Sequence, residues 1–189
     1  MLRARDRGAE LGAPAVTPAT GALLRVTAAA VQARAVVEIG TGSGVASLWL
    51  LRGMAPDGVL TTIDPDAAHQ RAAKAAFAEE GVPAPRTRMI ARTASQVLPR
   101  LADGAYDLVL VSTEPHELGT CLDAAVRLLR PGGVLALTDA LLGGRVTDAT
   151  ARDDATHDAR RALAALRDDD RLVPAMVPLG GGLLLAVRR

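Results

Sequence analysis

The 189-residue chain has the size of one α/β domain, and its 49% share of hydrophobic residues is enough to fill a core. A formal net charge of +1 and an aromatic content of 2% provide no field for a polyanion and few stacking platforms, so we expect no nucleic-acid partner. The single cysteine, Cys121, excludes an internal disulfide, and no apolar run approaches the ~20 residues that cross a bilayer. We therefore expect no membrane partner and a cytoplasmic location.

Helix-like and strand-like patterns alternate along the chain after residues 1–15, a charged segment that we expect to be partly flexible. Helices are predicted at about 18–33, 45–54, 66–79, 94–101, 118–129 and 148–167, and strands at 35–39, 59–63, 86–91, 106–111, 134–137, 171–179 and 183–187. Strands that alternate with helices favour a parallel sheet, whereas three glycines between the last two strands predict an antiparallel hairpin. The sequence thus predicts one α/β domain over 1–189, with helices on both faces of a mostly parallel seven-stranded sheet.

A glycine-rich turn follows the first predicted strand. That strand contains Glu38, and glycines then stand at every second position, as Gly40, Gly42 and Gly44. Glycines let a ligand approach the backbone, and the start of the next helix offers unpaired N–H groups. The usual dinucleotide fingerprint is G-x-G-x-x-G, whereas this segment reads E-x-G-x-G-x-G with an acid inside the strand. A carboxylate there repels a pyrophosphate and suits a cationic ligand, which disfavours an NAD-dependent oxidoreductase.

A second acid, Asp64, ends the second predicted strand, roughly 20 residues after the glycine turn. An acid at this place can accept hydrogen bonds from both hydroxyls of a ribose. Glu38 and Asp64 together describe a pocket for a positively charged nucleoside such as S-adenosylmethionine. Simpler alternatives stay open, because Glu38 could pair with an arginine, Asp64 could cap the next helix, and the glycines could serve the turn alone.

Further segments stand in a familiar order around these motifs. They are 16–18 (VTP), 64–66 (DPD), 106–111 (YDLVLV), 128–133 (LLRPGG), 143–146 (GGRV) and 177–183 (VPLGGGL). Over almost its whole length the chain resembles the S-adenosylmethionine-dependent O-methyltransferases related to catechol and caffeoyl-CoA O-methyltransferases, in the actinobacterial branch of that family. The resemblance implies a Rossmann-like class I methyltransferase fold and a homodimer.

The resemblance also implies which residues contact the methyl donor. The predicted S-adenosylmethionine contacts are Val16, Glu38, Gly40, Thr41, Gly42, Gly44, Ala46, Asp64, Ala94 and Ser112. Ala94 carries over as a backbone contact to adenine, and Val16 could equally be a core residue. Ala46 stands where a serine often touches the methionine carboxylate, so we expect that hydrogen bond to be missing.

The metal site implied by the resemblance is incomplete in this chain. The family holds a divalent cation with an Asp after the fourth strand and an Asp-Asn pair after the fifth, and a lysine three residues after the first Asp commonly acts as base. Here Ser112 replaces the first Asp, Pro115 replaces the lysine, and Asp139 is followed by Ala140. Because hard cations need several oxygen ligands, we predict no tightly bound metal, with Glu114 as the remaining alternative ligand.

Two side chains remain as candidates for catalysis, Asp139 and His116. The unperturbed pKa of histidine suits a general base, although an unpaired loop histidine can equally be a solvated side chain. His69 and His157 are interpreted as surface or packing residues. The sequence predicts an S-adenosylmethionine-dependent methyltransferase that acts on the hydroxyl of a small-molecule acceptor without a tightly bound metal. The alternative is a non-catalytic S-adenosylmethionine-binding or interaction protein.

Overall fold

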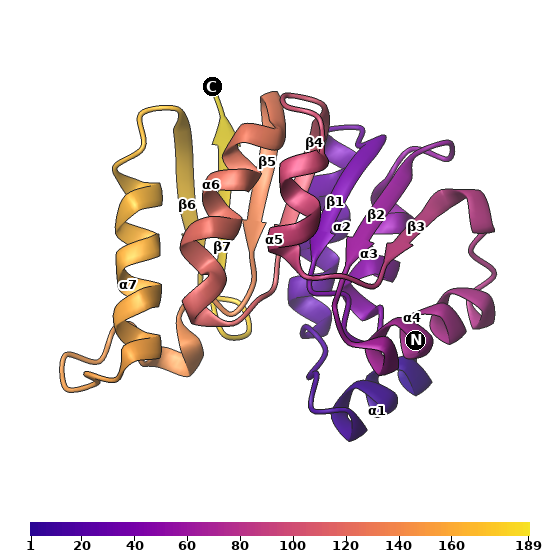
Figure 1. Cartoon of the computed structure of the whole chain (residues 1–189), viewed down its shortest axis with the longest axis horizontal. Helices are drawn as coiled ribbons and strands as arrows, with labels where there is room; N and C mark the ends of the chain where they lie inside the picture. Colours follow the sequence, from indigo (N-terminus) through magenta and orange to yellow (C-terminus); the bar gives the residue numbers. More distant parts are fainter.

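A computed structural model describes residues 1–189, which build one twisted sheet with helices on both faces (Figure 1). The strands are β1 (Ala35–Ile39), β2 (Val59–Ile63), β3 (Thr87–Ile90), β4 (Tyr106–Val111), β5 (Leu129–Leu137), β6 (Leu172–Val177) and β7 (Leu183–Arg188). They lie in the order β3-β2-β1-β4-β5-β7-β6, and β7 alone runs opposite to the common direction of the other strands. The predicted fold class is confirmed, including the C-terminal hairpin.

The helices divide between two hydrophobic clusters, one on each face of the sheet. The helices are α1 (Leu2–Glu10), α2 (Pro18–Ala30), α3 (Val45–Gly53), α4 (Ala67–Glu79), α5 (Ala94–Val97), α6 (Leu118–Leu128) and α7 (Asp154–Arg167), with 3₁₀ turns η1 (Ala84–Arg86), η2 (Leu98–Arg100), η3 (Pro115–Glu117) and η4 (Leu142–Gly144). Residues of α1 to α4 pack in one cluster and residues of α5 to α7 in the other. The central strands contribute side chains to both clusters, so their nearly continuous apolar runs are buried on two faces.

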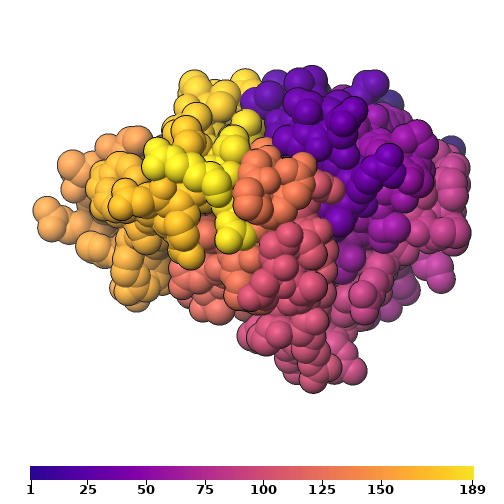
Figure 2. All heavy atoms as spheres, turned by 90° about the horizontal axis from the view of Figure 1, so that it is seen from above, coloured from indigo at the N-terminus to yellow at the C-terminus, as the bar shows by residue number.

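Successive parts of the chain lie side by side across the sheet. Figure 2, seen from above, shows the N-terminal part in indigo and purple on one side and the C-terminal part in orange and yellow on the other. The strand order explains this, because β1 to β3 extend the sheet in one direction and β4 to β7 in the opposite direction. The order therefore reverses between β1 and β4, and in open α/β sheets ligands bind beyond the carboxyl ends of the strands at such a point.

Side-chain caps set the starts of three helices. Thr17, Asp66 and Asp153 each accept a hydrogen bond from a backbone N–H of the first turn of α2, α4 and α7. The predicted cap Asp66 is confirmed, at 2.6 Å from the N–H of Ala68. Because Asp153 is the cap, α7 begins later than the predicted helix at 148–167.

Most of the N-terminal segment is helical. Residues Leu2–Glu10 form α1, which packs against α4, and the partial flexibility expected of residues 1–15 stays a prediction. Ala4 is fully buried in that contact, and Arg7 donates to both carboxylate oxygens of Glu79 at 2.9 and 3.1 Å. The abundant charge that suggested flexibility is therefore used in part for ion pairs with α4.

Asp107 ties the beginnings of three neighbouring strands together. Its carboxylate accepts hydrogen bonds from the backbone N–H groups of Arg34 and Ala35 at 2.7 and 2.9 Å, and from Nε of Arg130 at 2.7 Å. Desolvation opposes the charge, but the hydrogen bonds from Ala35, Arg130 and Arg34 outweigh it and lower the pKa of Asp107. A carboxyl group with a lowered pKa stabilises the fold above its unfolded pKa and loses this contribution as the pH falls.

We expect Asp107→Ala to lower the free energy of unfolding by about 2 to 3 kcal/mol at neutral pH, because two backbone N–H groups and a guanidinium lose a charged acceptor. Urea unfolding should show the difference shrinking below about pH 4, where the carboxyl group becomes protonated. Asp103→Ala is the control, since its ion pair with Arg127 lies at the surface and should contribute less than about 1 kcal/mol. Equal losses in the two variants would contradict the assignment.

Candidate functional site

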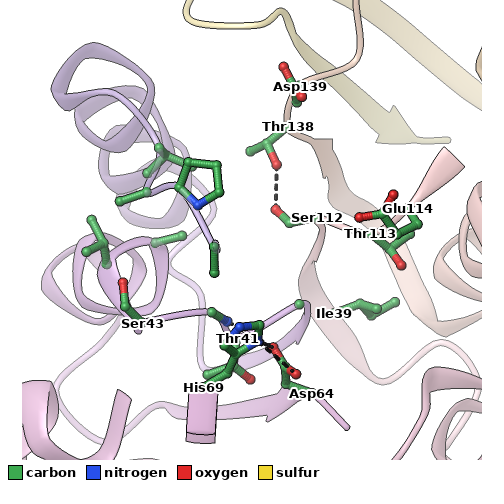
Figure 3. Close-up of a pocket in the computed structure, with 18 of the residues that line it drawn as sticks. Ile39, Thr41, Ser43, Asp64, His69, Ser112, Thr113, Glu114, Thr138 and Asp139 are labelled. Carbon is green, nitrogen blue, oxygen red and sulfur yellow. Dashed lines mark hydrogen bonds and ion pairs between the residues drawn. The ribbon is translucent and has the colours of Figure 1, made fainter. Parts of the chain in front are cut away.

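A cavity of about 550 Å³ lies beyond the carboxyl ends of β1, β2, β4 and β5. Figure 3 shows side chains from these strand ends facing it, with Thr41 and Asp64 on one side and Ser112, Thr138 and Asp139 on the other. The loop 12–17 between α1 and α2 completes the wall. The cavity therefore occupies the place where the strand order reverses.

The glycine turn needs glycine for two different reasons. Gly40, Gly42 and Gly44 all have positive φ, at 90°, 49° and 82°. A Cβ on Gly40 would lie 1.9 Å from the carbonyl oxygen of Ser112, so a side chain there cannot fit. Gly40 and Gly42 line the cavity, whereas Gly44 faces α4. A contact between Gly44 and a ligand therefore has no support from this geometry.

Asp64 lies at the cavity wall, as predicted for the acid after the second strand. Its carboxylate accepts hydrogen bonds from the N–H groups of Gly42 at 3.0 Å and Asp66 at 2.9 Å. Nδ1 of His69 lies 3.1 Å from the same carboxylate. The alternative that Asp64 caps the next helix is wrong, because Asp66 is the cap. Asp64 thus links the glycine turn of β1 to the start of α4.

Glu38 does not line the cavity, in contrast to the predicted ligand contact. Its side chain is fully buried between α3 and β2, where the hydroxyl groups of Ser47 and Thr62 donate to Oε2, the latter at 2.6 Å. The alternative of a partner arginine is wrong as well. Oε1 has no hydrogen-bond partner, and burial raises the pKa of Glu38 to about 7 against the hydrogen bonds from Ser47 and Thr62. Glu38 is therefore a buried group beneath the turn.

The opposite wall is formed by the ends of β4 and β5. Ser112 and Thr138 are hydrogen-bonded through their hydroxyl groups (Figure 3). Asp139 lies between this cavity and a second one of about 310 Å³, and its carboxylate has no hydrogen bond or ion pair. Partial burial raises its pKa, and its backbone has a positive φ of 54°. An unpartnered carboxylate at the junction of two cavities is available to exchange a proton with a ligand.

The structure separates the second catalytic candidate from the site. His116, on η3, is exposed and lines neither cavity, so its predicted role as a base has no support from this geometry. Glu114 lines both cavities, but no group of three His, Cys, Asp or Glu side chains is arranged to hold a metal ion. The prediction that no metal binds tightly stays a prediction.

The remaining predicted contacts are distributed around the same cavity. Val16, Thr41, Ala46 and Ala94 all line it. Sequence reasoning missed His69, which was interpreted as a surface or packing residue, and the hairpin glycines 181 and 182. The position of His69 could have indicated its place near Asp64, because it lies three residues after the cap of α4 and five after Asp64.

The strand order, the glycine turn and the acid after β2 define a Rossmann-like domain with a nucleoside-sized site. The model of the O-methyltransferase family matches residues 3–189, and the chain belongs to this family. None of its helices is long and apolar enough to cross a membrane. The predicted family is therefore confirmed.

Individual relatives agree with this assignment. A candidate O-methyltransferase from Mycolicibacterium vanbaalenii is 54% identical over 188 residues, which cover 100% of this chain and 83% of that protein. A solved structure from Corynebacterium glutamicum has a TM-score of 0.92 and 39% identity, and the match covers 99% of this chain and 88% of the other. The O-methyltransferase TomG from Streptomyces achromogenes, solved in complex with SAM, has a TM-score of 0.88 and 31% identity, with coverages of 99% and 88%.

Burial of Glu38 makes the stability of the fold depend on pH. Because its folded-state pKa of about 7 exceeds the unfolded value of 4.5, the folded state holds the proton in this interval and the unfolded state does not. This group should therefore lower the free energy of unfolding by about 3 kcal/mol as the pH rises from about 4.5 to 7. Urea unfolding of wild type and Glu38→Gln across this range should show the variant gaining relative stability with rising pH. A constant difference between the two would contradict a buried, proton-binding Glu38.

Proposed function

We propose that this protein is an S-adenosylmethionine-dependent O-methyltransferase that methylates a hydroxyl group of a small molecule without a tightly bound metal. The observation that carries the proposal is the junction at Asp139, where an unpartnered carboxylate lies between the cavity at the glycine turn and a second cavity. Membership of the O-methyltransferase family and the SAM complex of TomG support the methyl donor and the type of reaction.

The residues around the larger cavity fit the methyl donor. Gly40 and Gly42 expose bare backbone, Asp64 offers a carboxylate, and a volume of about 550 Å³ suits a nucleoside with an amino-acid tail. We assign Val16, Thr41, Ala46, Ala94 and Ser112 to the same binding surface. When bound, S-adenosylmethionine supplies an electrophilic methyl group and retains the electron pair of the broken carbon–sulfur bond on sulfur.

The chain's own residues orient the acceptor and accept its proton. The second cavity has an apolar wall that includes Leu118, Leu137 and Leu142, which can hold the body of a small acceptor. We assign Asp139 as the general base that takes the proton from the acceptor hydroxyl as the new carbon–oxygen bond forms. Holding both reactants in one dry, oriented geometry supplies much of the catalysis in a displacement of this kind.

A divalent metal does not fit the residues at this place. The hydroxyl of Ser112 is hydrogen-bonded to Thr138, and Pro115 offers no side-chain ligand. Asp139 with a serine hydroxyl falls short of the several oxygen ligands that Mg²⁺ requires. No step of the proposed reaction therefore passes through a metal ion.

The location, oligomeric state and partners of the enzyme are proposed from family resemblance and composition. We place it in the cytoplasm as a homodimer by resemblance to the family, and its low net charge and low aromatic content disfavour a nucleic-acid partner. The competing proposal is a non-catalytic S-adenosylmethionine-binding protein.

Two measurements separate these proposals. Calorimetry with S-adenosylhomocysteine tests the donor site, and transfer of a radiolabelled methyl group from S-adenosylmethionine to catechol, caffeate and a panel of phenols and other hydroxylated aromatics tests catalysis. Binding together with transfer supports the enzyme. Binding without transfer to any acceptor favours the non-catalytic protein, and absence of binding contradicts both.

We expect Asp139→Asn to lower kcat by about 10²-fold or more, because the amide cannot accept the proton of the acceptor. The dissociation constant for S-adenosylhomocysteine should change by less than about twofold, since the substitution is isosteric. Glu114→Gln is the matched control, because Glu114 also lines both cavities. Its kcat should change by less than about tenfold. A larger loss in Glu114→Gln than in Asp139→Asn would assign the base to Glu114.

Removal of divalent metal should leave activity unchanged. Dialysis against EDTA and later addition of MgCl₂ are expected to alter kcat/KM by less than about twofold, because the oxygen ligands at Ser112 and Asp139 are too few for a hard cation. The measurement is methyl transfer before dialysis, after dialysis and after addition of metal. Loss of activity with EDTA and recovery with Mg²⁺ would show that a metal takes part after all.

A further inference from the structure

His69 lies in the wall of the donor cavity next to the acid assigned to the ribose. It belongs to the first turn of α4, its side chain is 20% exposed, and it is drawn beside Asp64 in Figure 3. Nδ1 of His69 lies 3.1 Å from Oδ2 and 3.3 Å from Oδ1 of Asp64. The imidazole is therefore held by the carboxylate rather than turned into solvent.

The carboxylate of Asp64 is already largely occupied by the protein. The N–H of Gly42 donates to Oδ2 and the N–H of Asp66 donates to Oδ1, and the His69 imidazole approaches both oxygens. A carboxylate has about four acceptor positions, so few remain for a ligand. A ribose brings two hydroxyl donors at once. Asp64 alone is thus a poor match for the whole diol.

The contact between Nδ1 of His69 and Asp64 leaves His69 able to accept a hydrogen bond from the second ribose hydroxyl. A carboxylate partner at Nδ1 keeps the proton of a neutral imidazole on that nitrogen and leaves the lone pair on Nε2. The nearest acidic oxygen to Nε2 is on Asp66 at 3.9 Å, which is too long for a hydrogen bond. Nε2 is therefore an acceptor without a protein partner, on a side chain that lines the cavity.

We propose that His69 and Asp64 read the ribose of the methyl donor together, with the carboxylate accepting one hydroxyl and Nε2 of His69 accepting the other. This inference rests on the proposed function, because it assigns a role within the donor site. His69 is then a specificity-determining residue for the ribose diol. A purely supporting role, in which the imidazole only holds the Asp64 carboxylate, predicts no preference between ligands with and without a given hydroxyl.

The test is calorimetric binding of S-adenosylhomocysteine and its 2′-deoxy and 3′-deoxy analogues to wild type and to His69→Asn. The asparagine amide can replace Nδ1 next to Asp64 but offers nothing at the place of Nε2. We expect His69→Asn to weaken binding of S-adenosylhomocysteine about three- to tenfold, the effect of one hydrogen bond. For one of the two deoxy analogues this loss should disappear, because that analogue lacks the hydroxyl that Nε2 accepts.

His157→Asn is the matched control, since His157 is exposed on α7 and lines neither cavity. Thermal unfolding of both variants should confirm that each remains folded. The inference is overturned if His69→Asn binds S-adenosylhomocysteine as tightly as wild type, or if it loses the same factor for all three ligands. Failure of wild type itself to bind S-adenosylhomocysteine would instead overturn the proposed function, and this inference with it.

Discussion

The close approach of Gly40 to the backbone of Ser112 fixes how the two sides of the site face each other. A Cβ on Gly40 would lie 1.9 Å from the Ser112 carbonyl oxygen, so the segments after β1 and β4 lie backbone against backbone at this point. One segment carries the glycine turn, and the other leads to the hydroxyl pair of Ser112 and Thr138. Since backbone contacts deform little, the distance between donor and acceptor surfaces is built into the sheet.

Beneath the glycine turn, a small polar cluster supports the wall of the methyl-donor cavity. Its buried polar atoms lower the stability of the folded state. Thr41 and Thr62 share a hydrogen bond of 2.7 Å, and Thr62 also donates to the buried Glu38. Oε1 of Glu38 is left without a partner, which an apolar core would avoid. A cluster of this kind fixes orientation because each hydroxyl has only a few satisfactory arrangements. The turn is thereby held in place from below as well as by Asp64 at its edge.

The sequence predicted the fold well because its signals are local. The connection between β6 and β7, residues 178–182, is too short for a parallel crossover and predicts a hairpin. The distance from the glycine turn to Asp64 follows from the length of one helix and one strand. The site was predicted less well, because a site depends on the direction in which each side chain points. An apolar strand buried on both faces does not reveal which side Glu38 takes, and neither the outward direction of His116 nor the contact of His69 with Asp64 is encoded by spacing. Likewise, α1 depends on partners in α4 that lie far along the chain.

The proposed role of Asp139 as the general base sets a chemical limit on the acceptor. Reference pKa values of about 3.9 for aspartate and about 10 for a phenol differ by about 6 units, equivalent to about 8 kcal/mol for complete proton transfer. Burial of Asp139 raises its pKa and so narrows the difference between the two pKa values. A reaction that deprotonates the hydroxyl only as the carbon–oxygen bond forms avoids the full cost. The site is therefore best matched to hydroxyl groups more acidic than a simple phenol, for which less of the proton transfer is uphill.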